Sequence, residues 1–133
     1  MEIVRYAFDL APGRPPQKAL QNEWGLSLHL QSWQAADSKQ VLIDFGCTPE
    51  RLNNNLELLK IDPAQLDALV LSHGHYDHFG GLNGFLAANN GRLKAGLPFY
   101  LGGEECYCTP EAVVGGTARD FGYLDRKASP TRG

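Results

Sequence analysis

The chain has 133 residues, a length typical of one domain with a hydrophobic core of its own. Twelve Lys and Arg against fifteen Asp and Glu give a formal net charge of −3, which argues against a protein that binds nucleic acid or an anionic membrane. No signal-peptide pattern, no membrane-spanning apolar run and an odd number of cysteines (three) together favour a cytoplasmic protein without a disulfide framework.

Two alternating stretches precede the centre of the chain. Residues 3–9 alternate between apolar and polar side chains, which predicts an opening strand. Residues 24–31 alternate in the same way and predict a half-buried strand. We expect His29, on its polar face, to face solvent or to form a local hydrogen bond. The apolar face of this second strand holds Trp24, Leu26, Leu28 and Leu30.

The centre of the chain predicts a strand–helix–strand unit. A short apolar strand over residues 41–45 is followed by Thr48 as a helix N-cap and Pro49 at the first helical position. Residues 68–71 are apolar without alternation, which is typical of a strand covered on both faces. A crossover of this length makes the two strands parallel, so Asp44 would lie near the same sheet edge as the residues that follow Leu71.

The last third of the chain predicts a helix from about 79 to 90 and a strand over residues 99–101. Gly80 and Gly81, at the start of that helix, would allow a close approach of another group, and its amino end would favour an anion. We expect one domain over residues 1–133, with a loose tail from about residue 128.

Four side chains of metal-ligand type lie within six residues, directly after the predicted strand 68–71. They are His73, His75, Asp77 and His78. Imidazole and carboxylate suit a borderline metal such as Zn²⁺. Without a metal, charged imidazoles would repel one another, and burying them would cost desolvation energy. We therefore predict a metal-binding loop at the carboxyl edge of the sheet.

Asp44 is placed to support this loop, because it ends the neighbouring parallel strand. Its carboxylate would accept hydrogen bonds from the backbone of the loop or from a ligand imidazole, as outer partners of metal sites commonly do. The alternative is an aspartate at a strand end that faces water.

The segment HGHYDH (residues 73–78), with the FGGL that follows it, closely resembles the H-x-H-x-D-H signature of the metallo-β-lactamase superfamily. Residues 42–46 are similar to the strand that carries the structural aspartate of that family. Residues 22–27 and 121–127 are similar to its ribofuranosylaminobenzene-phosphate (dihydropterin-type) synthase-like branch. The resemblance implies an α/β fold, half of an αββα sandwich, with a mixed sheet and flanking helices.

The same resemblance implies the roles of the ligands. His73 and His75 would help to hold one metal, and Asp77 and His78 a second, so up to two ions bind. Zinc is the first expectation, with manganese and iron as alternatives. A hydroxide shared by the metals would attack an ester, lactone or phosphate ester of a small-molecule substrate. Asp77 would also orient the attacking water.

One departure from the family pattern leaves several hypotheses open. No histidine follows His78, whereas family members supply further ligands from a second half of the fold. We therefore expect a truncated chain, or a minimal relative that completes its sites across a homodimer. The alternatives to a hydrolase are a related transferase, a non-catalytic metal-binding remnant, and a structural zinc site in which Cys106 and Cys108 join His73 or His75. Metal binding that is lost on mutating the cysteines would favour the last of these.

A half-sandwich would also leave one face of its sheet uncovered. Trp24, Leu26, Leu28 and Leu30 are candidates for that face. An apolar patch of this kind drives self-association. We expect dimers or larger species and little turnover from this chain alone.

Overall fold

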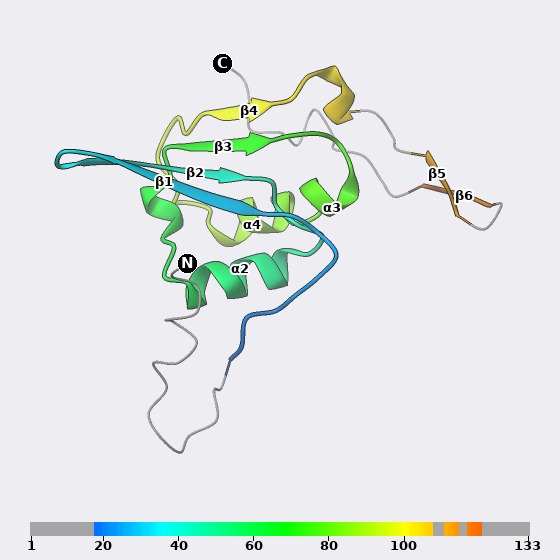
Figure 1. Ribbon diagram of the computed structural model, residues 1–133, viewed down its shortest axis with the longest axis horizontal. Helices are drawn as coiled ribbons and strands as arrows, with labels where there is room; N and C mark the ends of the chain where they lie inside the picture. Colours follow the sequence, from blue (N-terminus) through cyan, green and yellow to red (C-terminus); the bar gives the residue numbers. More distant parts are fainter. Residues whose placement is uncertain (1–17, 108–110, 115–116, 121–133) are drawn as a thin grey trace.

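The computed structural model describes residues 18–107, 111–114 and 117–120. Its centre is a four-stranded mixed sheet in the order β1-β2-β3-β4, and β5 and β6 pair as a separate hairpin (Figure 1). The predicted strand at residues 3–9 and the predicted tail lie outside the described residues. The strands are β1 Leu28–Gln34, β2 Asp37–Ile43, β3 Ala68–Leu71, β4 Phe99–Leu101, β5 Glu111–Val114 and β6 Thr117–Asp120. The helices are α2 Pro49–Leu58, α3 Tyr76–Phe79 and α4 Leu82–Ala88, with short 3₁₀ turns at Pro63–Gln65 and Glu104–Tyr107.

The parallel strands follow the sequence prediction closely. β2 pairs in parallel with β3, and β3 with β4, so the strand–helix–strand unit and the strand at residues 99–101 are confirmed. The mixed sheet arises because β1 runs antiparallel to β2, with Leu28 opposite Ile43. The fold is therefore the predicted α/β arrangement of a mixed sheet with helices.

The boundaries of the first two strands differ from the prediction. The strand predicted from residue 24 begins at Leu28, and the strand predicted from residue 41 begins at Asp37. A tight turn at Ala35, whose φ of 54° is left-handed, joins them into a hairpin. Residues before Leu28 leave the sheet because the backbone of Leu26 bonds instead to Asp77 and Gly46.

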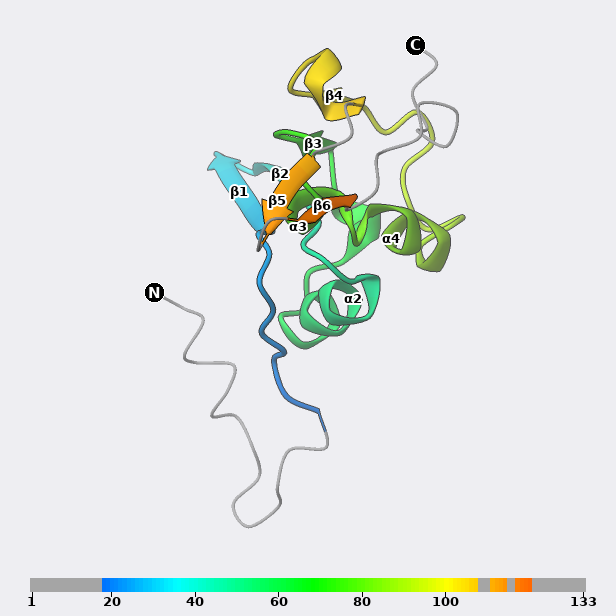
Figure 2. The same ribbon diagram turned by 90° about the vertical axis from the view of Figure 1, so that its right-hand side faces the viewer.

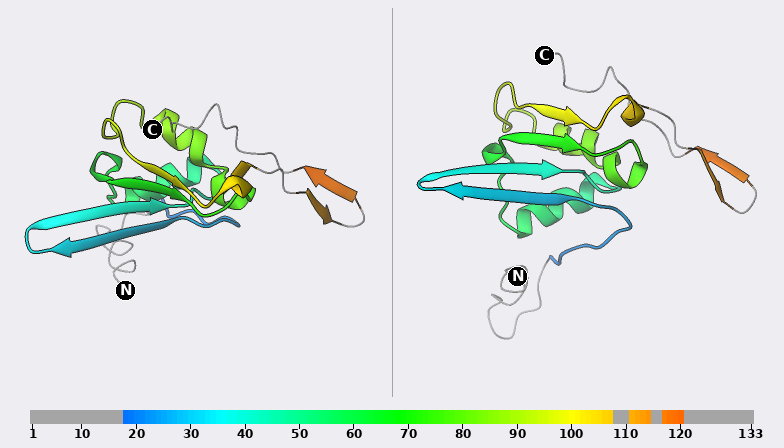
Figure 3. Two further views of the ribbon diagram at one scale, coloured as in Figure 1. Left: turned by 90° about the horizontal axis from the view of Figure 1, so that it is seen from above. Right: turned by 45° about the horizontal axis from the view of Figure 1, so that its top comes forward.

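Helices α2 and α4 lie together on one face of the sheet (Figures 2 and 3). The core between the two layers is apolar and nearly solvent-free, and Phe45 at its centre packs against Phe85 and Phe99 with ring centroids 5.9 and 6.1 Å apart. The sheet contributes Leu42, Leu69, Leu71 and Phe99, and the helices contribute Leu52, Leu56, Leu82 and Phe85. Packing of this core holds in place the strand ends from which the candidate site is built.

The opposite face of the sheet carries apolar side chains that no described helix covers. Strand register places Leu28, Leu30, Val41, Ile43, Val70 and Tyr100 together on this bare face. Of these, Leu28, Leu30 and Tyr100 are 45%, 53% and 59% exposed. β1 is half-buried as predicted, but through its polar face. Gln31 and His29 are half-buried on the helical side, and His29 bonds to Gln40 Oε1 at 3.0 Å.

The helix predicted over residues 79–90 is split. α3 ends at Phe79 and α4 begins at Leu82, because the Gly81 N–H donates to the Gly46 carbonyl and the Asp77 carbonyl accepts the Leu26 N–H. Gly80 and Gly81 lie so close to the carbonyls of Cys47 and Phe45 that a side chain would not fit. α4 has only seven residues, so its helix dipole gives little support to the anion binding predicted at its amino end.

At α2, Pro49 occupies the first turn as predicted, and Thr48 is the N-cap residue. The Thr48 hydroxyl nevertheless makes no cap to the helix, so that part of the prediction is wrong. It donates to Glu23 instead, at 2.7 Å. Among the described residues, no helix has the length and apolar character that crossing a bilayer requires.

Candidate metal centre

The HGHYDH segment leaves the carboxyl end of β3 and turns directly into α3. His75 is the N-cap residue of α3, and the turn closes through His78 N–H donating to the His75 carbonyl at 2.9 Å. The segment is tied to the end of β2 because Phe45 N–H donates to the His78 carbonyl at 2.6 Å. The four predicted ligand side chains thus project from a loop held on two sides by backbone bonds.

The structure brings the predicted ligands together in two pairs. His73 Nε2 lies 3.1 Å from His75 Nδ1, and His78 Nε2 lies 3.7 Å from Asp77 Oδ2. The two pairs adjoin, since the ring centroids of His73 and His78 are 4.0 Å apart. These are the same pairs that the family resemblance assigns to a first and a second metal.

The spacing within each pair fits one edge of a coordination shell. A tetrahedral zinc ion with nitrogen ligands at about 2.0–2.1 Å holds neighbouring donors about 3.3 Å apart. The observed 3.1 and 3.7 Å lie within a few tenths of an ångström of that spacing. Within the described part of the chain, however, no group of three or more His, Cys, Asp or Glu side chains is arranged to hold one ion. Each pair therefore supplies two donors, where a catalytic zinc usually has three from protein.

Asp44 lies beneath the loop with only 2% of its side chain exposed. Its Oδ1 accepts the Ser72 backbone N–H at 2.8 Å, and its Oδ2 accepts the Ser72 hydroxyl at 2.7 Å and His78 Nδ1 at 2.8 Å. Its φ of 59° is left-handed, a conformation that aspartate tolerates better than most residues. The carboxylate accordingly bonds both to the loop backbone and to a predicted ligand imidazole, and it does not face water.

These bonds also assign the tautomers of two histidines. A carboxylate only accepts, so His78 carries its proton on Nδ1. The Ser72 hydroxyl donates to Asp44 and therefore accepts from His73 Nδ1, 2.9 Å away. Both imidazoles then present an unprotonated Nε2, the form that binds a metal. One buried carboxylate thus orients two predicted ligands, one directly and one through Ser72.

The electrostatics of the loop act in the same direction on His73. Burial, followed by the nearby His78 and His75 rings, holds the pKa of the His73 imidazole below its ordinary value, and Asp44 and Asp77 offset only part of this shift. The neutral, metal-binding form of His73 is therefore favoured.

Ser72 is the residue of this network that the sequence pattern does not single out. Its only signal is a hydroxyl between a buried strand and the first predicted ligand, a position that many solvated serines share. Its role becomes visible only when parallel pairing of β2 and β3 brings the carboxylate of Asp44 to it.

The cysteine alternative has one partner within the described residues. Cys106 is 1% exposed and packs in the hydrophobic core, with its Sγ 3.9 Å from the Leu71 carbonyl. Cys108 lies outside the described residues. The surroundings of Cys106 are those of an ordinary buried thiol.

We expect Asp44→Asn to lower metal affinity by about 10- to 100-fold, the usual loss for an outer partner of a metal ligand, while the fold remains intact. The amide cannot accept from the Ser72 hydroxyl and His78 Nδ1 without presenting its own N–H groups to one of its present donors. Zinc titration against a chromophoric chelator measures the effect, with Asp62→Asn, at the 3₁₀ turn, as the control carboxylate. Complete metal loss in a folded protein would make Asp44 a ligand, and unchanged affinity would contradict its supporting role.

Comparison with known proteins places this geometry in a family. Residues 32–95 match the family model described as the metallo-beta-lactamase superfamily. The matched range contains β2, α2, β3 and the whole HGHYDH segment. Over residues 32–95 the chain is therefore similar to the metallo-β-lactamase superfamily. The mixed sheet, with both helices of its core on one face, agrees with the predicted partial metallo-β-lactamase fold.

The chain is also similar to curated proteins of two kinds, a synthase and a metal-dependent hydrolase. The chain is 35% identical over 69 residues to the 7,8-dihydropterin-6-methyl-4-(beta-D-ribofuranosyl)-aminobenzene-5'-phosphate synthase of Methanocaldococcus jannaschii, covering 52% of this chain and 24% of that protein. It is 42% identical over 108 residues to a UPF0173 metal-dependent hydrolase of Staphylococcus aureus (strain JH9), covering 74% of this chain and 44% of that protein. The chain therefore spans less than half the length of these curated relatives.

Proposed function

We propose that this chain is a metal-dependent hydrolase that cleaves an ester, lactone or phosphate ester of a small molecule. The observation that carries the proposal is the arrangement of two donor pairs over one buried carboxylate, with His73 Nε2 and His75 Nδ1 3.1 Å apart. The name of the staphylococcal relative, a metal-dependent hydrolase, supports the same reaction type.

Each residue of the loop has a separate task in this proposal. His73 and His75 would hold one divalent ion, and Asp77 and His78 would hold a second. The donor set favours zinc, with manganese and iron as alternatives. A metal bound there supplies Lewis acidity and lowers the pKa of a water molecule to about 7. Asp44 and Ser72 keep the imidazoles of His73 and His78 aligned, since their bonds fix the protons on Nδ1.

Asp77 has the additional task of handling the proton of the attacking water. Its side chain is 38% exposed, so a water molecule and a substrate can reach the carboxylate. In the reaction, a bond forms from the water oxygen to the carbonyl carbon or phosphorus, and the ester bond to the leaving oxygen breaks. The proton taken up by Asp77 then passes to the leaving oxygen.

A transferase is the second candidate, and one observation favours it. The Methanocaldococcus relative is named as a synthase, and its match to this chain includes 35% identity over 69 residues. The same loop would then direct a different acceptor to the reacting group. Product analysis in the presence and absence of an added alcohol or amine acceptor separates the two reactions.

We expect slow, metal-dependent turnover from this chain, because each ion has two protein donors in place of three. The assay uses phosphodiester, phosphomonoester and lactone substrates with added zinc or manganese. Asp77→Ala should remove the turnover, and Asp62→Ala, which alters an exposed carboxylate away from the loop, should leave it unchanged. A protein that binds metal but turns over none of the three substrate classes would contradict the hydrolase and favour a non-catalytic remnant.

A further inference from the structure

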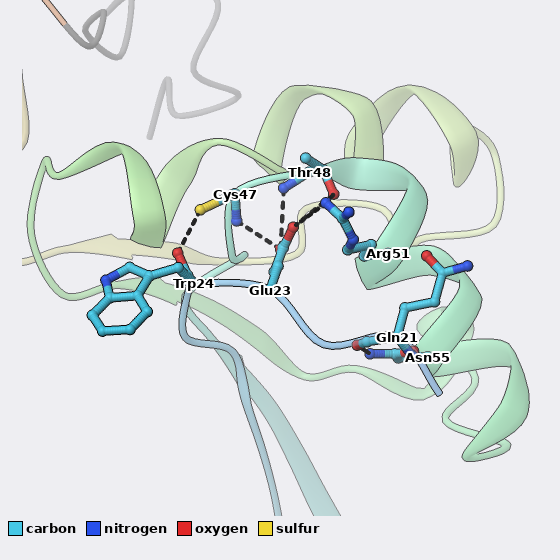
Figure 4. Close-up of polar contacts among 7 residues, drawn as sticks. All are labelled: Gln21, Glu23, Trp24, Cys47, Thr48, Arg51 and Asn55. Carbon is cyan, nitrogen blue, oxygen red and sulfur yellow. Dashed lines mark hydrogen bonds and ion pairs between the residues drawn. The ribbon is translucent and has the colours of Figure 1, made fainter. Parts of the chain in front are cut away.

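The segment that leads into β1, residues 18–27, runs along α2 and then reaches the HGHYDH segment. Its first part is attached to the exposed side of α2 by the Lys18–Glu57 ion pair at 2.8 Å. Two hydrogen bonds join Gln21 to Asn55, one through the Gln21 N–H and one through its carbonyl, both at 2.8 Å (Figure 4). We call residues 18–27 the lead-in segment.

Glu23, in the middle of the lead-in segment, is bound at the amino end of α2. Its Oε1 accepts the backbone N–H groups of Cys47 and Thr48 at 2.8 and 3.1 Å, and its Oε2 accepts the Thr48 hydroxyl at 2.7 Å. Arg51 Nη1 lies 3.3 Å from the same Oε2 (Figure 4). The side chain is only 13% exposed. Glu23 therefore bonds the backbone just before α2, at Cys47 and the N-cap residue Thr48, and places its negative charge at the positive end of the helix.

The surroundings of Glu23 are shaped to receive a carboxylate. The left-handed φ of 63° at Gly46 favours glycine, and a Cβ there would lie 2.5 Å from Glu23 Oε1, so another residue would displace the carboxylate. Burial alone would raise the pKa of the Glu23 carboxyl, but the hydrogen bonds from Thr48, Cys47 and Arg51 together hold it below its ordinary value. Glu23 is thus ionised at neutral pH with its acceptor positions filled.

Three residues further on, the lead-in segment reaches the predicted metal ligands. Leu26 N–H donates to the Asp77 carbonyl at 3.0 Å, and the Leu26 carbonyl accepts the Gly46 N–H at 2.9 Å. Gly25 passes so close that a Cβ there would lie 2.9 Å from both the Asp77 carbonyl oxygen and the Cys47 nitrogen. The backbone of Asp77 is therefore held on one side by a segment whose own position depends on Glu23.

We propose that Glu23 is a positioning residue for the metal loop: it clamps the lead-in segment to the amino end of α2 so that Leu26 holds the backbone of Asp77 in place. The inference rests on the proposed function only for the role of Asp77 as a ligand. Without the carboxylate, this part of the segment would keep the two Leu26 backbone bonds to Asp77 and Gly46 and the bond from the Cys47 thiol to the Trp24 carbonyl at 2.7 Å, but it would lose its charged contact with α2. The backbone of Asp77, and with it the spacing of the Asp77–His78 pair, would then no longer be fixed, whereas Asp44 would still orient the His78 ring directly and His73 through Ser72.

The experiment compares Glu23→Gln with Glu57→Gln, which removes a charge from α2 at the exposed Lys18 end of its contact with the lead-in segment. The first readout needs no metal: amide exchange at Leu26, followed by NMR, should accelerate about 10-fold in Glu23→Gln and remain unchanged in Glu57→Gln. The Gln40 amide, bonded to Asp67 at the other end of the sheet, reports whether the whole fold has loosened. Equal acceleration at both amides would overturn the proposal, since it would show a general loss of stability.

The second readout is zinc affinity, which should fall about 10-fold in Glu23→Gln. In an Asp77→Ala background the same substitution should cause no further loss, because the carboxylate acts through Asp77. Gly25→Ala, whose Cβ would meet the Asp77 carbonyl, should reproduce the affinity loss while the Glu23 carboxylate is kept, and it serves if Glu23→Gln does not fold. A wild type that binds no zinc contradicts the proposed function and leaves the exchange result standing. Unchanged Leu26 exchange in a folded Glu23→Gln overturns the positioning role itself.

Discussion

Replacing His73 and His78 together with alanine is expected to abolish stoichiometric zinc binding. Each substitution removes one member of a donor pair, which leaves His75 and Asp77 as single donors. It also removes the two imidazoles whose Nε2 atoms Asp44 directs toward the site. A single surface imidazole or carboxylate binds zinc too weakly to hold one ion per chain at the protein concentration of the experiment. Elemental analysis of purified protein after dialysis against zinc measures the bound metal per chain.

The fourth histidine of the chain provides a matched control. His29 lies on β1, bonds to Gln40 at 3.0 Å and belongs to neither donor pair. His29→Ala should therefore leave the zinc content at the wild-type value. Zinc content that is unchanged in the double variant would mean that the metal binds elsewhere, and the account of this loop would be wrong.

The bare face predicts the second large effect, on the state of association. We propose that a second copy of the chain covers this face, since its leucines are about half exposed and β1 is an edge strand of the sheet. Burying one leucine side chain contributes about 1.5–3 kcal/mol. Sedimentation of the wild type at micromolar concentration should show dimers or larger species, and Leu28→Lys with Leu30→Lys should shift it to monomers.

Trp33 supplies the control for this experiment. It is 70% exposed, yet it lies on the other side of β1, opposite Ser38. Trp33→Lys removes a large apolar side chain without touching the bare face, so association should persist. A wild type that sediments as a monomer at these concentrations would contradict the proposal.

Local sequence patterns predict the parallel strands well, because a few neighbouring side chains are enough to specify each strand. The apolar run Ala68–Leu71 and the Pro49 start of α2 need no knowledge of the rest of the chain. The loop ligands can also be predicted from local sequence, because four side chains of metal-ligand type lie within six positions. The edge placement of Asp44 follows from a single parallel pairing.

The errors in the sequence prediction arise where distant segments meet. Alternation in β1 groups Leu28 and Leu30 on one face, and the structure leaves that face uncovered as expected, but alternation does not show that the polar face with His29 lies half-buried on the helical side. The helix break depends on backbone bonds from Gly81 to Gly46 and from Leu26 to Asp77. Glu23 bonds to a helix start 24 to 28 positions along the chain, and no local pattern reports such a contact.

X-ray absorption at the zinc edge of the zinc-loaded protein tests the central claim most directly. The account places zinc among imidazole nitrogens and carboxylate or water oxygens, so the first shell should show only nitrogen and oxygen at about 2.0–2.2 Å, with the multiple scattering of imidazole rings. In His73→Ala/His78→Ala protein that imidazole signal should be lost. A sulfur shell at about 2.3 Å would assign the metal to cysteine and contradict a hydrolytic site in the His73–His78 loop.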